Sequence, residues 1–149
     1  MVGKPSTEWK TVDLSGSPRT LADYRGKVVL LDFWYRGCGW CIRAMPQLKQ
    51  VADDFRGQDV AVLGINSDDD LADAHFVIDK LGLNYDTLKN GEGNDRINMC
   101  YKIHAWPTLV MIDQSGVVRY MHAGYTPTLR QDLGEKIKKL LAEKSSAAK

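Results

Sequence analysis

The chain has 149 residues, of which 44% are apolar and 26% are charged, a composition typical of an ordinary globular protein with one domain. Twenty basic and nineteen acidic side chains give a formal net charge of +1, so neither nucleic acid nor an anionic lipid surface is expected as a partner. No apolar run approaches the ~18 residues that cross a membrane, and no signal segment opens the chain. These features leave the compartment open.

The first predicted elements surround one strongly apolar strand. Residues 2–26 show a short apolar alternation that includes Trp9, followed by a turn, which predicts a hairpin or edge strands. Residues 27–35 are almost continuously apolar, as expected of a strand covered on both faces. A helix is predicted over residues 38–55, where apolar side chains share one stripe and Gly57 gives a stop signal.

A second buried strand is predicted over residues 59–66. The sequence Ser67-Asp-Asp-Asp then opens a helix that ends at Gly82, with its acidic residues at the favourable N-terminal end. Residues 83–94 show no regular pattern, and a short helix is expected over residues 95–101.

The last predicted elements are a hairpin and a helix. Residues 108–113 and 117–121 are expected to be strands joined by a Gln-Ser-Gly turn, and a final helix starts at Thr126. The tail, residues 143–149, is expected to be frayed, and the core of the single domain covers about residues 2–141. This order predicts an α/β fold, with a central mixed β-sheet and helices on both faces.

Two cysteines three residues apart, Cys38 and Cys41, stand where the apolar strand gives way to the helix. Their sulfurs can bond across the first helical turn, and the helix N-terminus favours the thiolate of Cys38. A disulfide across so short a loop contributes little to stability, so its spacing favours a bond that is made and broken. We interpret the pair as a redox centre, with Cys38 as the nucleophile and Cys41 as the resolving thiol.

Two other interpretations of these cysteines remain open at this point. Zinc binding would need further ligands, and only Cys100 and His104 have suitable spacing, so no metal site is assigned. Two inert core thiols are the other alternative. Cys100 itself is expected to pack in the core.

Asp32 lies inside the apolar strand, six residues before Cys38. Alternation places it on the same face as Trp34, so its carboxyl should be at least partly buried and its pKa raised. Such a group could take the proton of Cys41 when that thiol must attack. The alternative is an acid paired with a lysine and without a catalytic role.

Several motifs together resemble one known family. These are residues 21–34 (LADYRGKVVLLDFW), the Cys38-Gly-Trp-Cys41 motif, Pro46, and residues 105–116 (AWPTLVMIDQSG). In this combination the chain resembles the TlpA/ResA-like thiol–disulfide oxidoreductases of the thioredoxin superfamily, which are related to the AhpC/TSA redoxins. The resemblance implies a thioredoxin-like fold and a redox-active disulfide with no other cofactor.

The resemblance also implies further site residues. Pro107 would form a cis peptide bond beside the disulfide and help to expose the preceding backbone to a partner. Trp40 and Trp106 could form an apolar rim that receives the partner, although partial burial in the core is as plausible an interpretation. Asp68 aligns with an accessory acid of ResA-like relatives, but such a residue more often caps a helix.

The expected partners are protein disulfides and an external thiol electron donor, for which a membrane thiol transporter is one source in the family. The chain is expected to be a monomer. The resemblance implies a periplasmic or other extracytoplasmic location, with the cytoplasm as the alternative.

Two rival functions share this fold: a thiol peroxidase of the peroxiredoxin type and a copper-binding or other metal-binding module. Tyr35 stands where such a peroxidase would carry Thr or Ser, three residues before Cys38.

Overall fold

The computed structural model describes residues 1–147, and its centre is a five-stranded mixed sheet in the order β5-β4-β3-β6-β7. The strands are β3 (Val28–Trp34), β4 (Val60–Asn66), β5 (Asp86–Lys89), β6 (Thr108–Ile112) and β7 (Val118–Ala123). β3, β4 and β5 are parallel, whereas β6 is antiparallel to both β3 and β7. The two predicted buried strands, β3 and β4, are therefore neighbours, and the predicted hairpin of β6 and β7 extends the sheet beyond β3.

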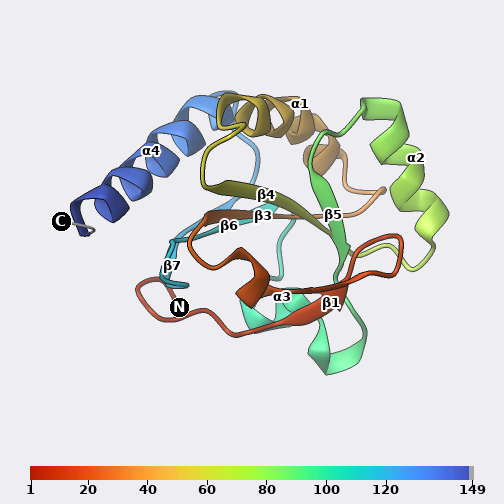
Figure 1. Ribbon diagram of the computed structural model, residues 1–149. Helices are drawn as coiled ribbons and strands as arrows, with labels where there is room; N and C mark the ends of the chain where they lie inside the picture. Colours follow the sequence, from red (N-terminus) through yellow and green to blue (C-terminus); the bar gives the residue numbers. More distant parts are fainter. Residues whose placement is uncertain (148–149) are drawn as a thin grey trace.

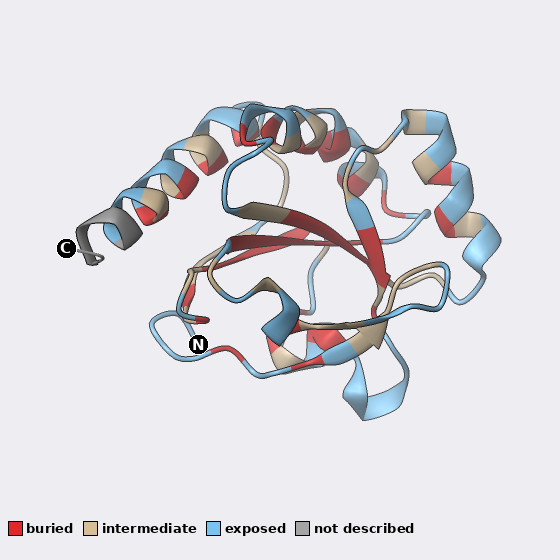
Figure 2. Ribbon diagram, viewed as in Figure 1, coloured by how far each residue is buried: buried red, intermediate tan, exposed pale blue. Residues whose placement is uncertain are grey.

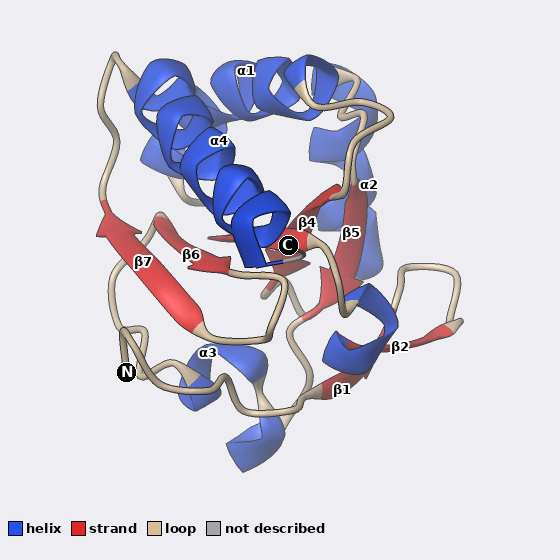
Figure 3. Cartoon of the chain, turned by 60° about the vertical axis from the view of Figure 1, so that its left-hand side comes forward, coloured by secondary structure: helices blue, strands red, loops and turns tan. Residues whose placement is uncertain are grey.

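Helices cover both faces of this sheet, as the sequence predicts (Figure 1). The helices are α1 (Gly39–Asp54), α2 (Leu71–Leu81), α3 (Ile97–Cys100) and α4 (Leu129–Ala147), with short 3-10 turns at Leu21–Tyr24 and Gly93–Asp95. α1 and α4 lie together over one face, whereas α3 and the small hairpin of β1 (Lys10–Val12) and β2 (Pro18–Thr20) lie on the other (Figures 1 and 3). The expected mixed α/β, thioredoxin-like architecture is confirmed.

All seven residues of β3 are buried (Figure 2). Its apolar side chains alternate between two cores. Leu30 packs with apolar residues of α1 and α4, whereas Leu31 and Phe33 pack with the cluster that contains Trp9 and Tyr101. A strand that is packed on both faces and hydrogen-bonded on both edges has little freedom to move. β3 is therefore a rigid base for the residues that follow it.

The structure adds one strand to the region that showed no regular pattern. β5 pairs in parallel with β4, and Thr11 Oγ1 of β1 donates a hydrogen bond of 2.6 Å to the Lys89 carbonyl oxygen on its other side. Only Thr87 and Leu88 of this four-residue strand are buried. A strand this short has too few apolar residues to produce a recognisable alternation in the sequence. It forms because it pairs with β4 and is hydrogen-bonded to β1.

Two helix boundaries also differ from the sequence prediction. α2 begins at Leu71 rather than near Ser67, because Asp70 is its N-cap and accepts a hydrogen bond of 2.9 Å from the Ala72 amide. α4 begins at Leu129 and its backbone stays helical to Ala147, which includes most of the segment expected to be frayed. Residues 148 and 149 of that segment lie outside the described residues.

The N-terminal residues lie along the outer edge of β7. Gly3 donates its amide hydrogen to the Val118 carbonyl oxygen at 2.7 Å, and the Val118 amide donates to the Lys4 carbonyl oxygen at 3.0 Å. β7 runs in the same direction as β3, because each is antiparallel to β6. The start of the chain is therefore fixed at the end of the sheet where β3 begins, opposite the end where it leads into α1.

Gly64 occupies a crowded position in the middle of β4. A Cβ atom there would lie 2.8 Å from Trp34 Nε1 and 3.2 Å from Thr87 Oγ1. We expect Gly64→Ala to lower the free energy of unfolding by about 1–3 kcal/mol, because the buried Trp34 must shift. Gly134→Ala is the matched control: its Cβ would meet nothing within 4 Å in α4, so it should stabilise by about 0.5–1 kcal/mol. Urea titration of both variants measures the difference, and equal stability of Gly64→Ala and wild type would contradict this account.

Candidate active site

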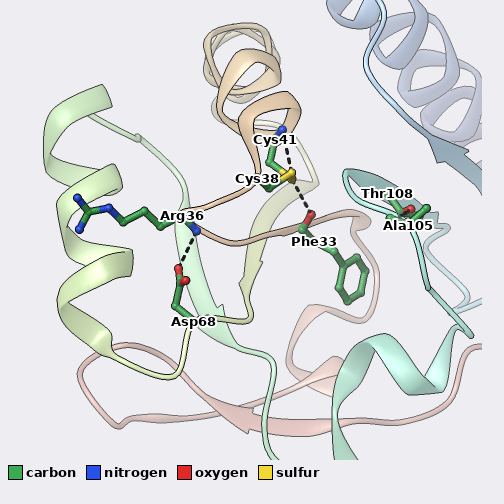
Figure 4. The surroundings of a disulfide bond; sticks show 7 residues. All are labelled: Phe33, Arg36, Cys38, Cys41, Asp68, Ala105 and Thr108. Atoms are coloured by element: carbon green, nitrogen blue, oxygen red, sulfur yellow. Dashed lines mark hydrogen bonds between the residues drawn. A yellow bond between two sulfur atoms is a disulfide. The ribbon is translucent and has the colours of Figure 1, made fainter.

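Cys38 and Cys41 form a disulfide at the point where β3 leads into α1 (Figure 4). Their Cα atoms are 5.2 Å apart, within the normal range for a disulfide. Cys38 is the N-cap of α1, and its sulfur accepts a hydrogen bond of 3.2 Å from the Cys41 amide. The unpaired amides of a helix N-terminus stabilise negative charge, so this position favours a thiolate on Cys38 after reduction.

The two sulfurs differ in their access to solvent. Cys38 is 6% exposed and Cys41 is fully buried, so a partner from outside can reach only Cys38. Cys41 Sγ lies 3.8 Å from the carbonyl oxygen of Phe33, which offers a hydrogen-bond acceptor to the thiol that reduction would release. The geometry therefore separates an outer sulfur that can attack from an inner sulfur that can resolve.

Asp32 is fully buried, and both of its carboxyl oxygens lack a hydrogen-bond partner among the described residues. Burial raises its pKa from 3.8 to about 7, because a charged carboxylate loses its hydration there. Asp32 lies on the α1 side of β3, next to Trp34, which packs in one cluster with Cys38 and Cys41. Burial thus raises the pKa of this carboxyl toward neutral pH, and no described hydrogen bond joins it to either sulfur.

Asp68 neither caps a helix nor touches the sulfurs. Its Oδ2 accepts hydrogen bonds of 2.9 Å from the Arg36 backbone amide and from Asn66 Nδ2. The Arg36 side chain points toward α2, where it pairs with Asp73 at 3.0 Å (Figure 4). Asp68 therefore links the end of β4 to the loop that precedes Cys38. This contact helps to position that loop.

Trp106 and Pro107 lie beside the disulfide, joined by a cis peptide bond. Trp106 is half-buried, packs against the cluster that contains both cysteines, and meets Tyr35 edge to face at a centroid distance of 6.1 Å. Tyr35 and Trp106 also line an adjacent hollow of about 500 Å³. The sequence predicts Trp106 either as part of an apolar rim or as a partly buried core residue, and the predicted rim does not include Tyr35. A role of Trp106 in partner binding stays a prediction.

Trp40, the other tryptophan assigned to the rim, is 58% exposed. Its ring stacks on Tyr125 at a centroid distance of 5.7 Å, and the Arg43 guanidinium lies 5.5 Å from the centroid of each ring. Tyr125 was missed by sequence reasoning, because 84 residues separate it from Cys41 and no local pattern connects them. Arg43 could have been found, since residues three apart on a helix share a face.

Cys100 stands apart from the disulfide. It is unpaired and half-buried, so it is more exposed than the core position that the sequence predicts, and burial raises the pKa of its thiol.

In the part of the chain that is described, no three His, Cys, Asp or Glu side chains are grouped so that they could hold a metal ion. None of the described helices combines the length and apolar character needed to cross a membrane.

Residues 2–121 match the AhpC/TSA family over most of the chain. The chain belongs to the AhpC/TSA family. Within the thioredoxin superfamily, it is 28% identical to the thiol-disulfide oxidoreductase ResA of Geobacillus kaustophilus, over 83% of this chain and 70% of that protein. This likeness confirms the resemblance to ResA-like proteins that the motifs indicate.

Solved structures share the fold of this AhpC/TSA family member. A thiol:disulfide interchange protein of Chlorobium tepidum matches with a TM-score of 0.80 at 21% identity, covering 93% of this chain and 96% of that one. A secreted disulfide oxidoreductase of Mycobacterium tuberculosis matches with a TM-score of 0.75 at 25% identity, covering 89% and 96% respectively. The thioredoxin-like fold is shared by both.

Proposed function

We propose that this AhpC/TSA family member is a thiol–disulfide oxidoreductase that reduces disulfides in partner proteins. The observation that carries the proposal is the unequal pair at the start of α1, with Cys38 slightly exposed and Cys41 fully buried. This arrangement lets Cys38 attack a disulfide of a partner protein while Cys41 stays within bonding distance of Cys38. The names of the ResA and interchange relatives describe the same class of activity.

The reaction takes place in two exchanges. The Cys38 thiolate attacks one sulfur of the partner disulfide, the partner S–S bond breaks, and the second partner sulfur leaves as a thiolate that takes up a proton. The Cys41 thiol then loses its proton and attacks Cys38 Sγ, which releases the first partner sulfur and forms the Cys38–Cys41 disulfide. Two electrons pass from the dithiol to the partner, and an external dithiol must return them by the same exchange.

Asp32 is proposed to accept the proton of Cys41 in the second exchange. A general base works best when its pKa is close to the working pH, and burial brings Asp32 to about 7. Because no described contact joins its carboxyl to Cys41, the proton would travel through an intervening water molecule.

The Asp32→Asn variant tests this role through the pH dependence of the second exchange. We expect the wild-type rate of mixed-disulfide resolution to rise with pH through about 7, where Asp32 ionises. The variant should lose this inflection and follow only the titration of the Cys41 thiol at higher pH. Rapid acid quenching and mass spectrometry measure the resolution rate, and an unchanged profile would assign Asp32 a structural role.

The same variant has a stability readout that is independent of activity. The pKa of Asp32 is higher in the folded chain than in the unfolded one, so the folded state holds the proton between pH ~4 and ~7. Stability from this group is therefore lost as the pH rises through that window. Asp32→Asn should gain stability relative to wild type from pH 4 to 7, up to about 4 kcal/mol, and the gain should then stay constant. A constant difference at all pH values would contradict the raised pKa.

The direct test of the proposed function uses the wild-type chain in four assays. Thiol titration should count two more thiols after reduction than before it, because one S–S bond yields two thiols. The reduced protein should reduce insulin disulfides, with dithiothreitol as the electron donor. Hydrogen peroxide turnover that depends on Cys38 would favour the peroxidase alternative, and a stoichiometric metal ion bound by the reduced cysteines would favour a metal-binding module.

We propose protein disulfides as substrates, an external thiol donor such as a membrane thiol transporter, and a monomeric, single-domain state. An extracytoplasmic location is supported by the description of the Mycobacterium tuberculosis structure as that of a secreted protein. Exposure of intact cells to a thiol reagent that does not cross membranes would label Cys38 in that location.

A further inference from the structure

The surface beside Cys38 carries a stacked group that the exchange mechanism does not use. We call it the Trp40 platform, made of Trp40, Arg43 and Tyr125. The two rings lie nearly parallel, with an interplanar angle of 25°, and the Arg43 guanidinium approaches both rings from the α1 side. Trp40 is the residue directly before Cys41, so the platform is built into the redox motif itself.

Arg43 is exposed and makes no ion pair with any residue that the structure describes. By contrast, Arg36 pairs with Asp73 and Arg130 pairs with Asp54. A guanidinium held against aromatic rings keeps N–H groups at its edge that can bind a carboxylate in bidentate geometry. Arg43 is therefore a fixed cation that lacks an acidic partner within the described part of this chain.

The platform is preformed and lies close to the cis-proline. The Gly124 amide, directly before Tyr125, donates a hydrogen bond of 2.8 Å to the Pro107 carbonyl oxygen. Gln47 of α1 donates to the Thr126 carbonyl oxygen at 3.1 Å, directly after Tyr125. These two contacts fix the segment that carries Tyr125 against both the proline and α1, so binding there requires little reordering.

A second surface feature near the disulfide cluster carries mainly negative charge. The hollow lined by Tyr35 and Trp106 contains four carboxylates and one cation, which are Asp68, Asp69, Asp70, Asp73 and Arg96. Asp73 is also paired with Arg36. Carboxylates therefore outnumber cations at this hollow, whereas the platform carries a cation that is unpaired within the described residues, so an acidic side chain of a partner is attracted more strongly to the platform.

We propose that the Trp40 platform is a recognition surface for a partner segment that carries an acidic side chain near the attacked cysteine. The inference rests on the proposed disulfide exchange at Cys38 and adds the chemistry of its preferred partner. The carboxylate of the partner binds the edge of the Arg43 guanidinium, while Trp40 and Tyr125 hold that guanidinium in place. An exposed pair of this kind contributes modestly to affinity, so its main effect is to select among partners.

The test compares disulfide-bonded peptides that differ only in one residue, which is Glu, Gln or Lys. Two sets are made, with this residue two positions before or two positions after the attacked cysteine. The reduced wild-type protein is mixed with each peptide at low ionic strength, and acid quenching followed by mass spectrometry gives second-order rate constants. In one of the sets, the Glu peptide should react about fivefold faster than the Lys peptide. The ratio should approach one in about 0.5 M NaCl, where the Debye length is short.

The Arg43→Glu variant should reverse this preference, so that the Lys peptide reacts faster than the Glu peptide. Arg56→Glu is the matched control: it makes the same change of net charge just past the opposite end of α1, some 20 Å away at 1.5 Å per residue, and should keep the wild-type preference. Absorbance at 240 nm gives the Cys38 thiolate titration in each variant and separates partner recognition from an effect on the nucleophile.

The outcomes distinguish the inference from the proposed function. Reduction of all peptides by wild type at equal rates would overturn the platform and leave disulfide exchange intact. Failure of wild type to reduce even the Gln peptide would overturn the exchange reaction and the platform with it. An equal slowing of all peptides in Arg43→Glu, together with a shifted Cys38 titration, would assign Arg43 to the nucleophile and overturn its role in recognition.

Discussion

Replacing Cys38 by serine is expected to lower the rate at which insulin disulfides are reduced by at least about a thousandfold, to the uncatalysed rate. Cys38 is the only sulfur of the pair that a partner can reach, since Cys41 is fully buried. A serine hydroxyl is not ionised at neutral pH, even at a helix N-terminus, and it cannot form a mixed disulfide. The measurement is the rate of insulin reduction with dithiothreitol as the electron donor.

Cys100→Ser is the matched control for that experiment. It removes one thiol from the same chain, but from a half-buried, unpaired position outside the disulfide cluster. We expect it to keep most of the wild-type rate. Substantial activity in Cys38→Ser, or a comparable loss in Cys100→Ser, would show that Cys38 is not the attacking sulfur.

Replacing Cys41 by serine should have the second largest effect, because it stops the cycle after its first exchange. Cys38 can still attack a partner disulfide in this variant, but no neighbouring thiol is present to release the product. The protein should therefore accumulate as a covalent adduct with its partner, and repeated turnover should cease. Intact-mass spectrometry under non-reducing conditions measures the adduct.

The adduct should disappear when a reductant is added, and Cys38→Ser should form none. These two controls separate a mixed disulfide at Cys38 from non-specific oxidation of Cys100. Release of the reduced partner by Cys41→Ser within a single turnover would contradict a resolving role for Cys41. It would also require another thiol to reach the mixed disulfide.

The central strand and the redox motif could be predicted because their signals are local. Residues 27–35 form an almost continuous apolar run, and β3 occupies residues 28–34, all of which are buried. The Cys38–Cys41 spacing predicts two sulfurs on one helical turn, and the structure joins them. Burial of Asp32 also followed from alternation along the same strand, and the structure confirms it.

Other parts of the site depend on contacts between distant segments, which periodicity does not encode. Tyr125 meets Trp40 only because the turn after β7 packs against the start of α1. Among the four polar residues 67–70, any could open the helix by composition. Asp70 does so, whereas Asp68 accepts a hydrogen bond from the Arg36 amide instead. The start of a helix and the contacts between distant residues therefore depend on tertiary packing, which can override local propensity.

The position of the first residues has a practical consequence for experiments on surfaces. Hydrogen bonds to Val118 fix residues 3 and 4 at the end of the sheet remote from Cys38. A flexible linker that joins residue 1 to a bead, a sensor chip or a vesicle would therefore leave from the back of the protein. The immobilised molecules would present their sulfurs toward the solution, where dissolved proteins could collide with them unhindered.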